Sequence, residues 1–377
     1  MADNLPRTVL VFPKDMTGGA ERWLRNLLDS ADSPVSDAVV LDHGPSALTT
    51  ELTRRGLTVH RMPVGASGAA VLAGALRLRR LLRHLAPQAV LANGVKAAAV
   101  AVPAGRLAGL PTVWAKHDHF HDGRLARVLG RLVTRVVAVS PAVAAATGRA
   151  DAVLVPQPRP VEPYPVDQAR DRLRQLGVDT GPGSAATLAM LTRLILYKGV
   201  DTAIEALART QGWRLVVFGG ADPATPGEGE RLRRLAAERG VGDRVQLLGQ
   251  VEDASRLLSG VDAVALLTRP GAGAVGGSEG YPTVQLETMM AGIPLIARAD
   301  RISTLPVEGV CDPNDFGTDE VDAVAHWLDR LRQPAERARY GAVLRPLVEQ
   351  HPTAADCARL LWDALTEAVA VRQGNPR

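Results

Sequence analysis

The sequence predicts an α/β protein of two domains, each with a doubly wound parallel sheet. At 377 residues, the chain is longer than one hydrophobic core usually organises. Short apolar runs of β-forming residues alternate with stretches of helical periodicity, and this alternation is typical of βαβ units. A proline-rich segment breaks the series near its middle, so we expect one domain on either side of it.

The first domain is expected over residues 1–160. Its predicted strands are short runs rich in Val, Leu and Ala, each followed by a turn or a helical pattern. They cover residues 8–12, 38–42, 57–61, 89–92, 112–116, 135–139 and 152–155. Apolar residues at helical spacing predict helices between them, such as 20–30, 70–85 and 124–135.

A linker separates this domain from the second one. Five prolines within residues 155–165 forbid a regular element there, and we expect an extended linker over 155–168. The second domain, 169–352, repeats the alternation. Its predicted strands cover residues 186–191, 213–218, 244–248, 262–267 and 293–297. The last helical stretch, about 353–371, fits packing against the first domain, but the sequence does not decide this.

The composition predicts a cytoplasmic protein. No apolar stretch approaches the roughly 20 residues that a membrane-spanning helix needs, and the first residues lack the pattern of a signal peptide. Cys311 and Cys357 are too few for a disulfide framework and are expected to be reduced thiols. Only four of the 44 basic residues are lysines, a bias typical of a high-GC bacterial genome.

Basic residues are concentrated in the first half. Residues 1–165 carry 20 Lys/Arg and 12 Asp/Glu, a balance of +8, and the remainder carries 24 and 28, a balance of −4. A basic half can attract nucleic acid, an anionic membrane or an anionic substrate. Aromatic residues make up only 3%, which disfavours nucleic acid. Helices 76–84 and 124–135 have a basic and an apolar face, and packing on a sheet is favoured over peripheral membrane contact for both.

Two cations flank the end of the first strand of the second domain. Arg193 and Lys198 lie in Thr-Arg-Leu-Ile-Leu-Tyr-Lys-Gly (192–199), between that strand and a helix. Open parallel sheets bind ligands at the carboxyl ends of their strands, so both cations are expected to reach a cleft between the domains. There they can neutralise a diphosphate without a metal. The alternative is a solvated basic turn paired with nearby carboxylates.

Two acids further along complete this pattern. Glu279 lies on a Gly-rich loop, and Glu287 lies in the helix that Pro282 opens and Gly292 ends. Carboxylates can accept bidentate hydrogen bonds from a vicinal diol, and the N–H groups that open the helix form a phosphate site. The pattern indicates a sugar-nucleotide site. A purely structural Glu287 would instead form a surface ion pair.

Two other motifs suggest different chemistry. Gly271, Gly273 and Gly276 match the dinucleotide fingerprint, but the helix follows only after Pro282, so a nicotinamide or flavin enzyme is disfavoured. If strand 112–116 continued, the imidazoles of residues 117, 119 and 121 would share one face and could bind zinc. Contact of these histidines with donor or acceptor is the favoured interpretation.

Over nearly its whole length the chain resembles the family 4 glycosyltransferases, which have the GT-B architecture of two Rossmann-like domains facing each other across a cleft. The specific signals are residues 192–199 and 279–297; residues 18–22, 76–94 and 116–118 support them. Thr192 stands where the family usually has glycine.

The resemblance implies transfer of a hexose from a nucleotide-diphosphate sugar to an acceptor hydroxyl, with retention and with no metal or other cofactor. The implied catalytic residues are His117, Arg193, Lys198 and Glu279. The implied donor site comprises Gly18, Gly19, Arg193, Lys198, Glu279, Gly280, Tyr281, Pro282, Thr283, Val284 and Glu287. The candidate acceptor contacts are Lys14, Asn93, Lys96, Asp118 and His121.

Within this set the resemblance assigns the diphosphate to Arg193 and Lys198, the ribose to Glu287 and the donor sugar to Glu279, with His117 near the reacting carbon. The alternatives are a sugar-nucleotide epimerase or hydrolase of the same fold, and a protein that binds sugar nucleotides without turnover. The donor nucleotide, uridine or guanosine, stays open. So does the choice between a small soluble acceptor and a lipid-linked one.

Overall fold

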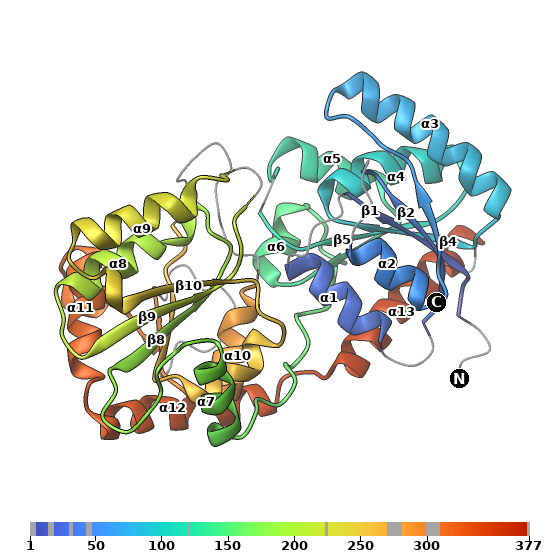
Figure 1. Ribbon diagram of the computed structural model, residues 1–377. Coiled ribbons are helices and arrows are strands. Elements are labelled where there is room, and N and C mark those ends of the chain that lie inside the picture. The colour runs from blue at the N-terminus through green and yellow to red at the C-terminus, as the bar shows by residue number, and fades with distance from the viewer. Residues whose placement is uncertain are drawn as a thin grey trace. The chain divides into compact units, whose positions relative to one another are not determined.

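The chain divides into two compact units, each of which contains a parallel α/β sheet (Figure 1). The computed structural model describes residues 5–13, 19–29, 33–42, 47–119, 121–222, 225–269, 281–298 and 310–374. Unit 1 comprises residues 1–158 and 352–377, and unit 2 comprises residues 159–351. The prediction of two parallel α/β domains is therefore confirmed.

Unit 1 contains a seven-stranded sheet in the order β3-β2-β1-β4-β5-β6-β7. Its strands are β1 (Thr8–Phe12), β2 (Val35–Val40), β3 (Thr58–Arg61), β4 (Ala89–Asn93), β5 (Thr112–Lys116), β6 (Arg135–Ala138) and β7 (Val153–Leu154). Every residue of the central strands β1, β4 and β5 is buried. This explains why they read as continuous apolar runs, because helices cover a parallel sheet on both faces.

Seven helices are described in unit 1: α1 (Gly19–Leu28), α2 (Ala47–Arg54), α3 (Gly68–Leu85), α4 (Val95–Ala108), α5 (Arg124–Leu132), α6 (Pro141–Ala146) and α13 (Ala354–Arg372). Helices α3, α4 and α5 pack side by side as one layer. Helix α13, red in Figure 1, comes from the far end of the chain and contacts α1, β4, β5, β6 and β7.

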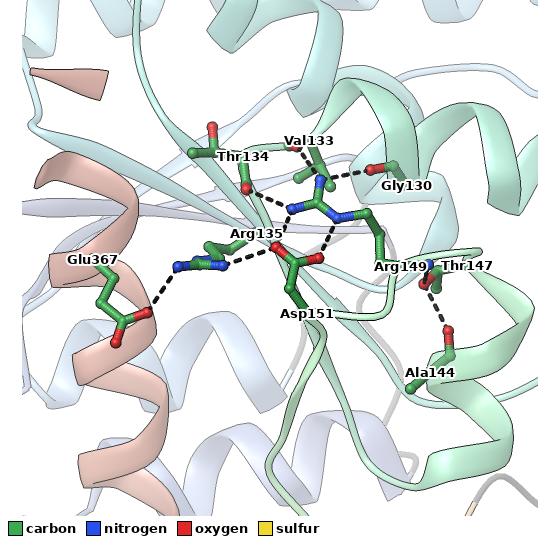
Figure 2. A network of polar contacts seen from close by, with 9 residues as sticks. All are labelled: Gly130, Val133, Thr134, Arg135, Ala144, Thr147, Arg149, Asp151 and Glu367. Atoms are coloured by element: carbon green, nitrogen blue, oxygen red, sulfur yellow. Dashed lines mark hydrogen bonds and ion pairs between the residues drawn. The ribbon is translucent and has the colours of Figure 1, made fainter. Parts of the chain in front are cut away.

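A network of arginines ties α13 and α5 to this sheet (Figure 2). Arg135 of β6 donates to Asp151 at 2.8 Å and to Glu367 of α13 at 3.1 Å. Arg149 donates to Asp151 and also to three backbone oxygens at the end of α5, those of residues 130, 133 and 134. These carbonyls have no partner within the helix. The hydrogen bond from Arg149 lowers the pKa of Asp151 to about 2, so the network stays charged near neutral pH.

Unit 2 contains a six-stranded parallel sheet in the order β10-β9-β8-β11-β12-β13. The strands are β8 (Ala186–Leu191), β9 (Trp213–Phe218), β10 (Val245–Gly249), β11 (Ala263–Leu266), β12 (Leu295–Ala297) and β13 (Val310–Cys311). The helices are α7 (Val166–Gln175), α8 (Val200–Ala208), α9 (Glu228–Glu238), α10 (Thr283–Ala291), α11 (Glu320–Arg330) and α12 (Pro334–Glu349). Short 3-10 turns include η2 (Leu196–Lys198) and η4 (Ala254–Gly260).

The proline-rich linker ends earlier than the predicted residue 168. Residues 155–165 contain no regular element, but α7 begins directly after Pro165. Proline restricts the residues before it and its own φ, yet it leaves the following residues free to be helical. Ala169 and Leu173 then bury the inner face of α7.

None of the helices in the described part of the chain combines the length and the apolar character that crossing a membrane requires.

Helix α10, which carries Glu287, is held by close packing against α12. A Cβ atom at Gly341 of α12 would lie 2.0 Å from the carbonyl oxygen of Gly292, the residue that ends α10. We therefore expect Gly341→Ala to destabilise unit 2 by about 1–3 kcal/mol through overpacking. Differential scanning calorimetry should show a melting temperature several degrees lower. Gly68→Ala on α3, where a Cβ meets no atom within 4 Å, is the control; an equal loss in both variants would contradict this account.

Candidate functional site

The first cation, Arg193, lies at the carboxyl end of β8 and is paired with a buried acid. Its guanidinium donates to Asp222, which follows β9 and is 4% exposed. Backbone hydrogen bonds join the two strand ends, from Leu194 N–H to the Gly220 oxygen at 3.0 Å. The Arg193 side chain remains 39% exposed. Arg193 is paired with a carboxylate, as the alternative of a basic turn predicted, but its exposed part can still donate hydrogen bonds to a ligand.

The second cation, Lys198, lies on η2, which is joined to the end of β11. The Arg269 side chain donates to the Leu196 oxygen and to Asp201, both at 2.6 Å, and its N–H donates to the Tyr197 oxygen at 2.7 Å. A Cβ atom at Gly199, where φ is +74°, would lie 2.3 Å from the Leu267 oxygen. Only glycine permits this close approach, so Lys198 is held beside the segment that leads from β11 toward α10.

Helix α10 places Glu287 in a buried position. Glu287 is 6% exposed and its neighbour Gln285 is fully buried, so a surface ion pair does not account for Glu287. Pro282 provides no side-chain cap, and the first turn of α10 contains no acidic residue. The N–H groups of this turn are therefore not capped by residue 282 and suit an anion. Tyr281, just before the helix, lies with its hydroxyl 3.3 Å from His351 Nε2.

A cavity of about 260 Å³ lies beside the Arg193 turn, at the carboxyl ends of β9 and β10. Its lining includes Gly219, Gly220 and Gly249 at the two strand ends, together with residues from the first turns of α9. Gly219 has φ +152°, and a Cβ there would lie 1.8 Å from the Thr192 oxygen. The close packing of this turn on residue 192 thus requires glycine at position 219.

In unit 1, His117 and Asn93 meet where adjacent strands β5 and β4 end. His117 Nε2 lies 2.6 Å from Asn93 Oδ1. The Trp23 ring of α1 contacts the imidazole edge-on, with ring centroids 4.7 Å apart. Burial and, secondarily, the nearby Lys116 charge lower the pKa of His117 to about 3. His117 is therefore neutral near pH 7, and it donates from Nε2 to the amide oxygen while Nδ1 becomes an acceptor.

The imidazoles of residues 117, 119 and 121 do not lie on one face of a strand. Strand β5 ends at Lys116, so the alternation needed for a row of imidazoles is absent. His119 Nδ1 lies 2.7 Å from Asp122 Oδ2, and His121 is exposed with φ +56°. The fully buried Lys116 also binds Asp122, at 2.6 Å. Within the described ranges, no three His, Cys, Asp or Glu side chains are grouped to hold a metal.

The structure therefore describes most of the predicted site. Lys14, Gly18, Glu279, Gly280 and residues 271–276 lie outside the described residues. Gly19 begins α1 and its carbonyl oxygen accepts from Gln157 at 3.4 Å; Lys96 is half-buried in the first turn of α4, and Asp118 is exposed.

Sequence reasoning did not include Trp23, Asp222 or Arg269. The Gly-Gly-Ala-Asp run after strand 213–218 is a signal that could have indicated Asp222, because it is a second turn at the same edge of the sheet.

Two family models match the chain: one described as Glycosyltransferase Family 4 over residues 17–159, and one described as Glycosyl transferases group 1 over residues 179–304. The chain belongs to glycosyltransferase family 4.

Curated relatives are similar to part of the chain, and solved structures share its fold. The D-inositol 3-phosphate glycosyltransferase of Mycobacterium marinum is 28% identical over 187 residues, 48% of this chain and 36% of that protein. The chain spans less than half the length of the curated relatives it matches. Anabaena HepE in complex with UDP-glucose has a TM-score of 0.77 at 19% identity, over 96% of this chain and 99% of that one. Sucrose-phosphate synthase from Thermosynechococcus elongatus has 0.73 at 17%, over 97% and 99%. The GT-B fold class is confirmed.

The low pKa of His117 makes the stability of this protein sensitive to acid. As pH falls below 6.5, the unfolded state binds the proton while the folded state resists it until about pH 3. Stability is thus unaffected above pH 6.5 and is lost as pH falls toward 3. Between pH 7.5 and 5 the loss from this residue is about 2 kcal/mol.

Urea unfolding at both pH values should show this loss in the wild type and a smaller one in His117→Gln. His84→Gln, at an exposed residue of α3, should behave as the wild type does. An unchanged pH dependence in His117→Gln would contradict the assignment.

Proposed function

We propose that the protein transfers a sugar from a nucleotide-diphosphate sugar to an acceptor hydroxyl, with retention at the anomeric carbon and without a metal ion. The proposal rests on the groups that lie at the carboxyl ends of the strands in the unit 2 sheet. There Arg193 at the end of β8 is 39% exposed, Lys198 lies on η2, and the first turn of α10 has no side-chain cap from Pro282. Fixed cations and oriented N–H groups are the groups that stabilise a diphosphate.

The donor would lie along this edge. Arg193 and Lys198 would bind the diphosphate, and the buried Glu287 would accept hydrogen bonds from ribose hydroxyls. The cavity beside Gly219 and Gly220 would receive a further part of the nucleotide, because glycine backbone allows close approach. Anabaena HepE is solved with UDP and with UDP-glucose, which makes a uridine diphosphate sugar the first donor to test.

The transfer step needs no base from the protein. The bond between the anomeric carbon and the phosphate oxygen breaks, and its electron pair leaves with the diphosphate. The acceptor oxygen attacks from the same face, and a phosphate oxygen takes its proton. Arg193 and Lys198 would stabilise the developing negative charge. His117, neutral and fixed by Asn93, would accept a hydrogen bond from a sugar hydroxyl through Nδ1 rather than exchange a proton.

Nucleotide binding can be tested by thermal stabilisation. Wild-type protein should melt at higher temperature with one nucleoside diphosphate or its sugar, equally with and without EDTA, because a ligand that binds only the folded state stabilises it. Glu287→Gln and Arg193→Gln should lose most of this shift. Arg209→Gln, whose partner is Asp322 on α11, is the matched control. A shift that requires a divalent metal, or that survives in both site variants, would contradict the assignment.

Turnover separates transfer from the alternatives. With the donor and a panel of acceptors that includes inositol phosphates, the product should retain the anomeric configuration of the donor by NMR. Lys198→Gln should lower kcat on the order of 100-fold, as expected for loss of a charge-stabilising group. Release of nucleotide without an acceptor would instead indicate a hydrolase, a changed sugar would indicate an epimerase, and binding without turnover would indicate a non-catalytic protein.

A further inference from the structure

The outer side of the α3–α4–α5 layer in unit 1 exposes a set of large apolar side chains. These are Leu72 and Leu76 on α3, Leu107 on α4, and Leu125, Val128 and Leu132 on α5, with exposures of 39–60%. Isolated exposed leucines are ordinary, but a group on neighbouring helices indicates an interaction surface. We call these six residues the apolar patch.

Packing on the sheet does not account for the apolar patch. Helix α5 buries Ala126 and Leu129, and these form its inner stripe. Leu125, Val128 and Leu132 repeat at i, i+3 and i+7, so they form a second stripe, and this one faces solvent. The helix thus has more apolar surface than its own unit uses.

Hydrogen bonds join the three helices that carry the patch. Arg79 of α3 donates to the backbone oxygen of Leu107 at 3.2 Å, and Arg106 of α4 donates to the backbone oxygen of Leu132 at 3.3 Å. These bonds hold the ends of α4 and α5 against the preceding helix. Helices α3, α4 and α5 also lie side by side in Figure 1.

The charges around the patch have one sign. Helices α3, α4 and α5 contain no acidic residue, and exposed arginines lie among the apolar side chains. They are Arg77, Arg80, Arg83, Arg106, Arg124, Arg127 and Arg131. Residues 52–150 as a whole contain 15 Lys/Arg and only two Asp/Glu, Asp118 and Asp122.

We propose that the apolar patch docks unit 1 on the surface of an anionic lipid bilayer. Aliphatic side chains can enter the boundary between headgroups and acyl chains, while arginines beside them bind anionic headgroups. Nucleic acid fits less well, because the three helices contain no aromatic residue on which a base could stack. An acidic protein would explain the arginines but not an aliphatic stripe without aromatic anchors. The proposal does not depend on the transfer reaction.

Vesicle flotation tests the proposal with the full chain. Wild-type protein should float with vesicles of mixed neutral and anionic phospholipid at low salt, float less at high salt, and not float with neutral vesicles. Two triple variants each remove one contribution to binding. Leu125→Ser with Val128→Ser and Leu132→Ser removes the apolar contribution, and Arg124→Gln with Arg127→Gln and Arg131→Gln removes the electrostatic one. Each should lower the bound fraction about tenfold or more.

Matched controls come from other helices. Val343→Ser with Leu360→Ser removes apolar side chains of similar exposure, 44% and 40%, and Arg339→Gln with Arg359→Gln removes exposed arginines. Both should float as the wild type does. Nucleotide stabilisation should persist in both triple variants, so a failure of the membrane proposal is separate from a failure of the proposed function.

Three results would overturn the proposal. One is equal flotation of wild type and both triple variants, or none at low salt. Another is oligonucleotide binding that the arginine variant loses while vesicles are ignored. The third is a dimer in solution that the leucine variant dissolves, since the patch would then bind a second copy of the chain.

Discussion

Parallel pairing is the constraint on which the candidate site depends. Every described strand pair in both sheets is parallel, so the strands of each sheet all end at one edge. In unit 1 this brings Asn93 at the end of β4 next to His117 after β5. In unit 2 it brings Arg193 after β8 next to Asp222 after β9. Residues remote in sequence become contacts only because of this shared edge, and glycines such as Gly199 allow the backbone to turn there.

Burial then decides which chemistry these side chains can perform. Enclosing His117 keeps its imidazole neutral, which makes it a fixed hydrogen-bonding group and a poor proton carrier near pH 7. Asp222 is buried but paired with a cation that is still partly exposed, so the pair keeps a positive side toward solvent. His117 can orient a ligand without carrying charge, whereas Arg193 supplies positive charge. This division suits the proposed transfer, in which the leaving diphosphate itself accepts the proton.

The sequence predicts elements well where local pattern alone determines them. Strands 8–12, 112–116, 186–191 and 213–218 match β1, β5, β8 and β9 to the residue, because each is an apolar run bounded by turns. Helix α7 was not predicted because the five prolines that precede it indicated an extended linker.

The Arg193–Asp222 pair forms only through the register of β8 and β9, which no local sequence pattern encodes. Glu287 was assigned a surface alternative because one acid beside leucine looks amphipathic, but residues 285–290 are all buried. The sequence also does not show which apolar stripe of α5 faces solvent, because the inner and outer stripes both have helical spacing.

The proposed docking surface of unit 1 begins directly after the turn at 117–123 that carries two of the candidate acceptor contacts. This turn follows β5, carries Asp118 and His121, and ends at Gly123, whose φ of +100° turns the chain into the first residue of α5. Arg124 and Leu125 therefore begin the proposed docking surface only a few residues after the candidate acceptor contacts. If α5 lies on a bilayer, the turn lies at the bilayer boundary, and an acceptor held in the headgroup layer reaches it without leaving the membrane. A small soluble acceptor has no need of such a surface, so the docking proposed for the apolar patch would favour the lipid-linked class that the sequence left open.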